Sequence, residues 1–253
     1  MVQKPGFARR LLLSVDVMGY GRRDDREHAD VQRALLMVLN EAAHASGLDR
    51  LDWSRQGAGD GELAILPDQE AEPVVVDDFV AELHAALRYY NHGRLPEFRM
   101  RLRLAIHFGA AIKADNGYAG QGVVLVSRLV DSRPPHLALE QDDGALLAVM
   151  VSDEVYQDVV VQRHTKLTDQ DFREVAVDNK ETRVRAWLRV PGSDIRALRL
   201  EAPGGAQRAV APGPASAVTR APGLGQGQMV HTVVNGSVHA PGAVFGISNG
   251  ALG

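Results

Sequence analysis

Residues 11–18, LLLSVDVM, decide the fold: they are a short run of β-forming apolar residues that only Ser14 and Asp16 interrupt. Such a run is typical of a buried strand. A carboxylate inside that strand costs several kcal/mol unless a cation neutralises it. The sequence therefore predicts a buried strand in which Asp16 either forms a structural ion pair or binds a metal ion.

The segments that follow this strand alternate between helical and strand patterns. Apolar residues at helical spacing predict helices over residues 25–45 and 71–91. Between them, residues 51–56 and 62–66 predict a hairpin around a glycine-rich turn. Residues 99–107, RMRLRLAIH, predict a strand with one wet face. The order strand, helix, hairpin, helix, strand indicates a ferredoxin-like α+β fold.

Further elements are expected to extend this core toward the C-terminus. The sequence predicts a helix over residues 120–130, a strand over 146–151 and a helix over 153–161. Two more strands are predicted at residues 172–177 and 183–190. The α+β core is therefore expected to carry additional C-terminal strands.

The composition changes abruptly after Val190. Residues 191–227 are rich in Pro, Gly and Ala and have almost no large apolar side chains, which is typical of a flexible linker. Residues 228–253 regain Val, Phe and Ile in short pieces separated by Asn-Gly, Pro-Gly and Gly. We expect three parts: a domain over residues 1–190, a linker over 191–227 and a separate tail over 228–253.

Charge and composition exclude several classes of protein. The 253 residues are 45% hydrophobic and carry a net charge of −4, so a wholly disordered chain is excluded and no nucleic-acid partner is expected. No run reaches the ~18 apolar residues of a membrane span, and no small-residue cleavage site follows the start, so we expect a cytoplasmic protein without a membrane partner. Cysteine is absent, so a metal ion would need oxygen or imidazole ligands.

The predicted hairpin tip, GAGDGELAIL at residues 57–66, carries a second acidic residue, Asp60. Gly59 and Gly61 beside it would let the backbone approach a ligand closely, or would simply form the turn. Asp60 is either a turn aspartate or, together with Asp16, part of a site for hard divalent cations, which prefer oxygen ligands. His107, at the end of an apolar strand, is expected to be a packing histidine.

Four segments in order resemble the catalytic domain of the class III nucleotidyl cyclases. They are SVDVMGYGRRDD, GAGDGELAILP, RLRLAIHFGAA and GYAGQGVVLVSRLVDS, and the resemblance covers residues 9–133. The continuation, ALLAVMVSDEVYQDVV, FREVAV and VDNKETRVRAWLRVPG, resembles an actinobacterial subset of cyclase-homology proteins. The resemblance implies the cyclase catalytic fold.

The resemblance implies a role for individual residues. Asp16 and Asp60 match the aspartates that hold two Mg²⁺ or Mn²⁺ ions, and Arg128 matches the helix arginine that stabilises charge on the reacting phosphoryl group. Gln56 falls where the family reads the purine edge, and Gly117 lies near the second base-reading position but offers no side chain. The resemblance also assigns Gly59 and Gly61, in the hairpin, to substrate binding.

Val124 departs from the family pattern. Four residues before the helix arginine, the family has an asparagine that orients the ribose, and valine offers no hydrogen bond. Two functions are therefore open: a cyclase that converts a nucleoside triphosphate to a 3′,5′-cyclic nucleotide and pyrophosphate, or an impaired domain that senses a nucleotide without turning it over. Because the family builds its sites between two subunits, the resemblance implies a homodimer.

The tail carries a second resemblance. HTVVNGSVHAPGAVFGISNG, residues 231–250, is similar to the amyloid-signalling motifs of bacteria, which resemble the RHIM motifs of animal necroptosis proteins. This implies assembly through an amyloid-like core, templated by a partner protein. A disordered terminus and a hairpin docked on the domain are the alternatives. The residues assigned to assembly are Asn235, Gly236, Val238, Val244 and Phe245.

Overall fold

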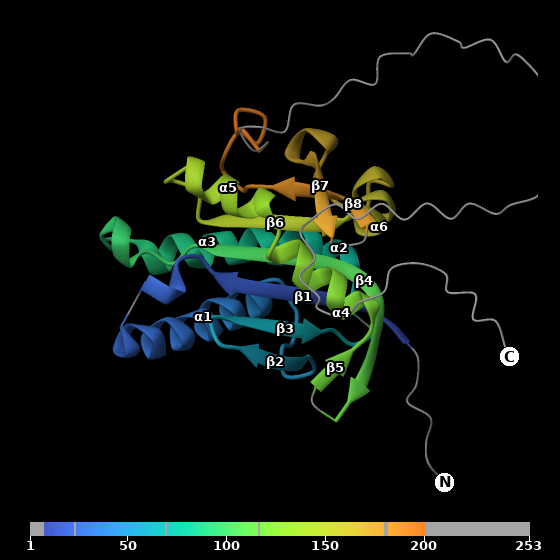
Figure 1. Ribbon diagram of the computed structural model, residues 1–253, viewed down its shortest axis with the longest axis horizontal. Helices are drawn as coiled ribbons and strands as arrows, with labels where there is room; N and C mark the ends of the chain where they lie inside the picture. Colours follow the sequence, from blue (N-terminus) through green and yellow to red (C-terminus); the bar gives the residue numbers. More distant parts are fainter. Residues whose placement is uncertain (1–7, 23, 69, 116, 180–181, 201–253) are drawn as a thin grey trace, which may run out of the picture. The chain divides into compact units, whose positions relative to one another are not determined.

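The computed structural model describes residues 8–22, 24–68, 70–115, 117–179 and 182–200 (Figure 1). The whole predicted tail lies outside these ranges. The assembly residues Asn235, Gly236, Val238, Val244 and Phe245 therefore stay predictions.

A single mixed sheet organises the described part of the chain. Its strands follow the order β2-β3-β1-β4-β6-β8-β7, and β5 pairs with β4 outside this path. The pair β4 and β6 is parallel, and the other pairs are antiparallel. The strands are β1 (Ala8–Val17), β2 (Ser54–Ala58), β3 (Gly61–Ile65), β4 (Leu102–Ala114), β5 (Gly117–Ala119), β6 (Leu147–Ser152), β7 (Arg173–Asn179) and β8 (Thr182–Arg189).

Helices pack on both faces of the sheet (Figure 1). The longest, α1, starts with a capping box in which Asp24 and Glu27 satisfy each other's backbone N–H groups. The helical segments are α1 (Asp25–Ala45), α2 (Glu72–Val74), η2 (Val75–Phe79), α3 (Val80–Asn91), α4 (Gln121–Val130), α5 (Arg133–Gln141), α6 (Asp153–Val155) and η4 (Tyr156–Val161), with short 3-10 turns η1 (Tyr20–Arg22), η3 (Pro96–Phe98) and η5 (Asp169–Asp171).

The alternation of side chains along β1 divides the core into two layers. Leu11, Leu13 and Val15 pack with α1 and α3, whereas Leu12 packs with α4 and α5 on the other face. Because successive side chains of a strand point to opposite faces, Asp16 shares the face of Leu12. The sheet therefore presents Asp16 on the face that α4 covers.

The predicted ferredoxin-like α+β arrangement is confirmed. β1, α1, the β2–β3 hairpin, the segment from α2 to α3, and β4 follow one another as expected, and β6, β7 and β8 are the additional C-terminal strands. β4 continues past residue 107 to Ala114 and turns back into β5. Helix α5 was not predicted, because two consecutive prolines, Pro134 and Pro135, usually indicate a turn, although proline is tolerated in the first turn of a helix.

The first residues of the expected linker pack against the domain. Ile195, Leu198 and Leu200 are buried in the same layer as α4 and α5. The Arg199 N–H donates to Gln141 Oε1 at 2.8 Å, which fixes this segment to α5. The expectation of a flexible linker over residues 191–227 is therefore wrong for residues 191–200, because the buried side chains of Ile195, Leu198 and Leu200 anchor this segment.

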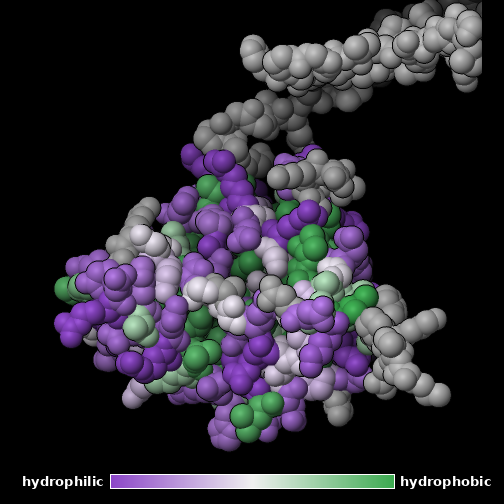
Figure 2. All heavy atoms as spheres, turned by 60° about the horizontal axis from the view of Figure 1, so that its bottom comes forward, coloured by the Kyte–Doolittle hydropathy of each residue, from purple (hydrophilic) through white to green (hydrophobic). Residues whose placement is uncertain are grey.

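The surface of the described part of the chain is mostly hydrophilic. On the face shown in Figure 2, exposed apolar residues form small patches between hydrophilic ones. In the described ranges, no helix combines the length and the apolar character needed to cross a bilayer.

Candidate functional site

Asp16 lies where β1 meets β3 and β4. It faces Gly61 on one side and Arg103 on the other, and it is 9% exposed. Its Oδ1 accepts a hydrogen bond from Arg103 Nε at 2.7 Å. Burial raises the pKa of Asp16 to about 6, although Arg103 opposes this shift, and repulsion from Asp131 and Asp60 adds to it. The structural ion pair expected as one alternative is therefore present, and it does not fully compensate the buried carboxylate.

Arg103 itself was not recognised from the sequence. The alternation in RMRLRL suggested that its arginines lie on a wet face, but Arg103 is 7% exposed and its Nη1 is buried without a hydrogen-bond partner among the described residues. Arg101 is also partly buried and donates to the backbone carbonyls of Asp142 and Ala145. The wet-face prediction is thus wrong for both residues, because α4 and α5 cover this face of the sheet.

Asp60 occupies the tip of the β2–β3 hairpin, as predicted. Its backbone carbonyl accepts a hydrogen bond from the Val17 N–H at 3.0 Å, so the tip is attached to the end of β1. Gln32 of α1 donates from Nε2 to the Gly59 carbonyl at 2.9 Å and to the Tyr20 hydroxyl at 2.8 Å. These bonds hold Asp60 beside the strand end that carries Asp16.

The backbone geometry of the hairpin explains why residues 59 and 61 are glycines. A Cβ on Gly61 would lie 2.2 Å from the Val15 carbonyl oxygen, so only glycine lets β3 approach β1 this closely. Gly59 has a φ of +61°, in the left-handed region that favours glycine. The backbone explains both residues, and their predicted contact with substrate stays a prediction.

Gln56 and Gly117 are brought together although β2 and β5 are remote in sequence. A Cβ on Gly117 would lie 2.1 Å from Gln56 Oε1, and Gly117 has a φ of +98°. The Gln56 side chain is exposed and therefore accessible to a ligand. The two positions that the resemblance assigns to base reading are thus adjacent within one chain.

Arg128 and Val124 lie on the exposed side of α4. Val124 is 38% exposed, and Arg128 forms no hydrogen bond or ion pair with the described residues. The helix can lie close to β4 because a Cβ on Gly122 would be 2.7 Å from the Ala110 carbonyl oxygen. Both residues line a cavity of about 400 Å³ that Arg9 and Glu154 also border.

Two buried polar contacts support this region. His107 is 5% exposed, and its Nδ1 lies 2.9 Å from Ser152 Oγ, which confirms the prediction of a packing histidine. Burial lowers the pKa of His107, so the ring is neutral at pH 7. Beside the hairpin, Arg50 Nη2 contacts both carboxylate oxygens of Glu62, at 2.8 and 2.9 Å. This second buried ion pair was not predicted either.

Asp16 and Asp60 are the two side chains at this site that we consider as ligands for a divalent cation such as Mg²⁺ or Mn²⁺. Among the described side chains, no hydrogen bond engages Asp16 Oδ2, and both residues offer the oxygen ligands that hard cations prefer. Within the described ranges, no group of three or more His, Cys, Asp or Glu side chains is assembled to hold a metal ion. Two carboxylates fit a cation that keeps water or phosphate oxygens as its other ligands.

Comparisons with known proteins support the fold. No family model and no curated protein matches the chain. An adenylate/guanylate cyclase/hydrolase from Silicibacter pomeroyi matches 74% of this chain and 99% of its own, with a TM-score of 0.54 and 20% identity.

Two further structures agree. The guanylyl cyclase Cya2 matches 79% of this chain and 100% of its own, with a TM-score of 0.52 and 15% identity. A bacterial light-regulated adenylyl cyclase matches 77% of this chain and 56% of its own, with a TM-score of 0.54 and 11% identity. The chain therefore has the fold of the adenylate and guanylate cyclase catalytic domain.

Proposed function

We propose that the folded part of the chain, which extends to Leu200, is a nucleotidyl cyclase domain that converts a nucleoside triphosphate to a 3′,5′-cyclic nucleotide and pyrophosphate. One observation carries the proposal: Asp16 and the hairpin tip with Asp60 meet at neighbouring strand ends of a cyclase-type sheet. These carboxylates are at the positions that the resemblance assigns to metal binding. A scaffold without ligands would leave the buried, incompletely compensated Asp16 unexplained.

Each residue then has a defined task. Asp16 and Asp60 would hold Mg²⁺ or Mn²⁺, which neutralises triphosphate charge and lowers the pKa of the ribose 3′-hydroxyl. Gln56, whose amide both donates and accepts, would contact the base edge beside Gly117. Arg128, which has no partner among the described residues, would stabilise charge on the reacting phosphoryl group.

We propose that the active form is a homodimer. The resemblance places the metal aspartates and the helix arginine of one site on different subunits. The exposure of Arg128 and Val124 on α4 supports this, because both side chains are available to a second copy of the chain. A monomer would then bind nucleotide weakly and have no turnover.

A second candidate function is a nucleotide sensor without turnover. Val124 favours it: the residue is exposed where a ribose-orienting amide is expected, and it offers no hydrogen bond. In this case the dimer still binds a nucleoside triphosphate, and its output is assembly through residues 228–253. We propose such coupling of nucleotide to tail assembly, in the cytoplasm, for either function.

Incubation of the purified chain with each of the four ribonucleoside triphosphates and Mn²⁺, followed by mass spectrometry, tests these functions. A cyclic monophosphate that disappears in Asp60→Asn and persists in the exposed control Asp52→Asn supports the cyclase. Nucleotide binding without product supports the sensor. Absence of both product and binding contradicts the proposal.

A further inference from the structure

Arg103 contacts Asp16 through one hydrogen bond whose place is set by the sheet. Asp16 on β1 lies directly opposite Arg103 in the register of β1 and β4. The Arg103 Nε–H donates to Asp16 Oδ1 at 2.7 Å, and no other described side chain bonds this carboxylate. One carboxylate oxygen is therefore held, and Oδ2 has no hydrogen bond among the described residues.

The surroundings of Asp16 confine its side chain. On the side away from Arg103, β3 presents Gly61, and a Cβ there would lie 3.2 Å from the Asp16 Cβ. Asp16 is 9% exposed and Arg103 is 7% exposed, and apolar side chains of α4 and α5 pack on the same face of the sheet. Because both groups are buried, little water is available to replace their hydrogen bond.

Stability alone is a poor explanation for this pair. A buried ion pair is often no more stabilising than apolar residues of similar volume. Arg103 also carries a cost, since its Nη1 is buried without a hydrogen-bond partner among the described residues. A pair of apolar residues at positions 16 and 103 would fill the same space without an unsatisfied donor. The pair therefore calls for a functional reason.

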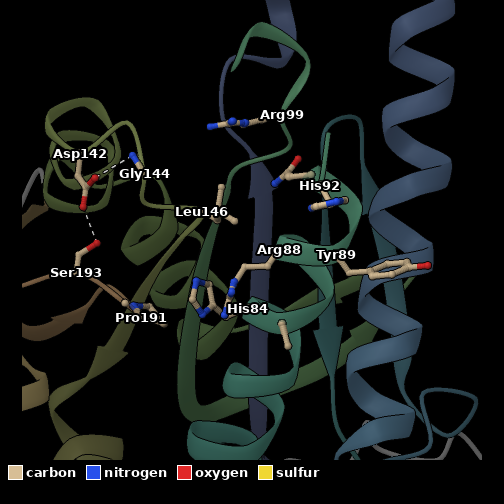
Figure 3. Close-up of a pocket in the computed structure, with 13 residues that line it drawn as sticks. His84, Arg88, Tyr89, His92, Arg99, Asp142, Gly144, Leu146, Pro191 and Ser193 are labelled. Atoms are coloured by element: carbon tan, nitrogen blue, oxygen red, sulfur yellow. Dashed lines mark hydrogen bonds between the residues drawn. The ribbon is translucent and has the colours of Figure 1, made fainter. Parts of the chain in front are cut away.

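Arg101, two residues earlier, is a part-buried arginine whose role is purely structural. Its guanidinium donates to backbone carbonyls, among them those of Asp142 at 2.6 Å and Ala145 at 2.7 Å. They belong to the loop before β6, where the Asp142 side chain accepts a hydrogen bond from Ser193 Oγ (Figure 3). Arg101 thus ties the start of β4 to this loop, whereas the one hydrogen bond of Arg103 goes to a side chain of the proposed metal site.

The other charged groups near the pair leave the site attractive to a cation. Asp131 and Asp60 both act on Asp16 by repulsion, and Arg103 is the positive group that opposes them. His136 on α5 also lies near Arg103 and is neutral at pH 7, because burial and the Arg103 charge lower its pKa. Three carboxylates and one guanidinium therefore act here, so Arg103 does not cancel the negative charge of the site.

We propose that Arg103 is a positioning residue for the divalent cation: it holds Asp16 Oδ1 and so keeps Oδ2 available to the cation that Asp16 and Asp60 bind. Hydrogen bonds from outside the ligand set orient metal-binding side chains, and their loss typically lowers metal affinity by about 10–100-fold. Arg103 acts through Asp16 and does not touch the nucleotide. This role rests on the proposed cyclase site.

Binding of Mn²⁺ to the full chain, measured by electron paramagnetic resonance with a non-hydrolysable nucleoside triphosphate of each base, tests this role. Arg103→Met removes the hydrogen bond and should weaken Mn²⁺ binding by about 10–100-fold. Arg103→Lys keeps the charge but not the planar group that reaches Oδ1, so its loss should be smaller. The matched control Arg101→Met lacks a contact with Asp16 and should leave Mn²⁺ affinity unchanged. Circular dichroism confirms that each variant is folded.

The Asp16→Asn background separates positioning from general damage to the fold. There Arg103→Met should weaken the residual Mn²⁺ binding no further, because residues that act as a unit are non-additive. The positioning role is overturned if neither folded Arg103 variant loses affinity while wild type binds Mn²⁺, or if Arg103→Met causes the same loss in both backgrounds. If wild type binds no Mn²⁺ with any of the triphosphates, the proposed function itself fails, and the role of Arg103 fails with it.

Discussion

At the residue scale, Asp16 combines burial with incomplete neutralisation. The Arg103 guanidinium bonds one of its oxygens, yet its pKa lies near 6, because desolvation outweighs that ion pair. A bound cation would stabilise the charged form of this carboxylate, because it would supply the positive charge that Arg103 alone does not provide in full. Without a bound cation, the charged carboxylate of Asp16 should lower the stability of the fold.

Stability without metal should therefore depend on pH through Asp16. Since the folded-state pKa is raised from 3.8 to about 6, the fold is favoured while Asp16 is protonated and loses stability as the pH rises from about 4 to about 6. The shift corresponds to about 3 kcal/mol. Urea unfolding in EDTA should show the difference between wild type and Asp16→Asn changing by this order across that window. An equal pH dependence in both proteins would contradict the assignment.

Val124 is the residue on which turnover depends in this account. Val124→Asn should raise cyclase activity by about one to two orders of magnitude, because it restores a donor that orients the ribose. Since Val124 is 38% exposed, the fold should tolerate the amide. Product formation measured by mass spectrometry checks this. The control Val161→Asn, at a position 47% exposed on η4, should leave turnover unchanged. Unchanged turnover in both would mean that more than one substrate contact has been lost.

At the element scale, the β2–β3 hairpin sets the distance between the two carboxylates. Its close approach to β1 requires a glycine at position 61, where a Cβ would collide with the Val15 carbonyl. The hydrogen bond from the Val17 N–H to Asp60 depends on the same approach. The hairpin is thus a positioning element for the site.

Gly61→Ala should separate the hairpin from β1. We expect a loss of roughly 1–3 kcal/mol in the free energy of unfolding, as for other insertions into packed regions, together with weaker metal-dependent nucleotide binding. Gly57→Ala is the matched control, because a Cβ there meets nothing within 4 Å. Urea titration and nucleotide binding of both variants test this. Equal stability of Gly61→Ala and Gly57→Ala would contradict the close approach.

Sequence patterns predicted elements with strong periodicity and missed those formed by long-range contacts. The helix over residues 25–45 and the hairpin around Asp60 were foreseen, because apolar spacing and glycine turns are local signals. The partner of Asp16 was not, since its identity depends on the register between β1 and β4. Likewise, Ile195 packs in the core layer that contains α5, and this long-range contact cannot be read from the local composition.

At the scale of the whole molecule, we propose two parts: a folded domain and a tail that drives assembly. The folded part extends to Leu200, because Leu198 and Leu200 are buried in its second core layer. The tail resemblance rests on residues beyond that point. The two halves of the proposed function are therefore separable by truncation.

A chain that ends at Leu200 should stay soluble and keep its nucleotide binding. A peptide of residues 229–253 should form fibrils with a cross-β diffraction pattern, because Val238, Val244 and Phe245 can pack in a dry interface. Replacing Val244 and Phe245 by Asp should prevent assembly, since stacked charges repel. A peptide that stays monomeric at high concentration would refute the assembly role.

The central claim is that Asp16 and Asp60 form one divalent-cation site for a nucleoside triphosphate. Mn²⁺-dependent nucleotide binding of wild type, Asp16→Ala, Asp60→Ala and the double variant tests it most directly, with Asp52→Asn as the exposed control. Each single variant should lose most of the metal-dependent binding, and the double variant should be hardly worse than either, because residues that act as a unit are non-additive. Full metal-dependent binding in both single variants would contradict the claim.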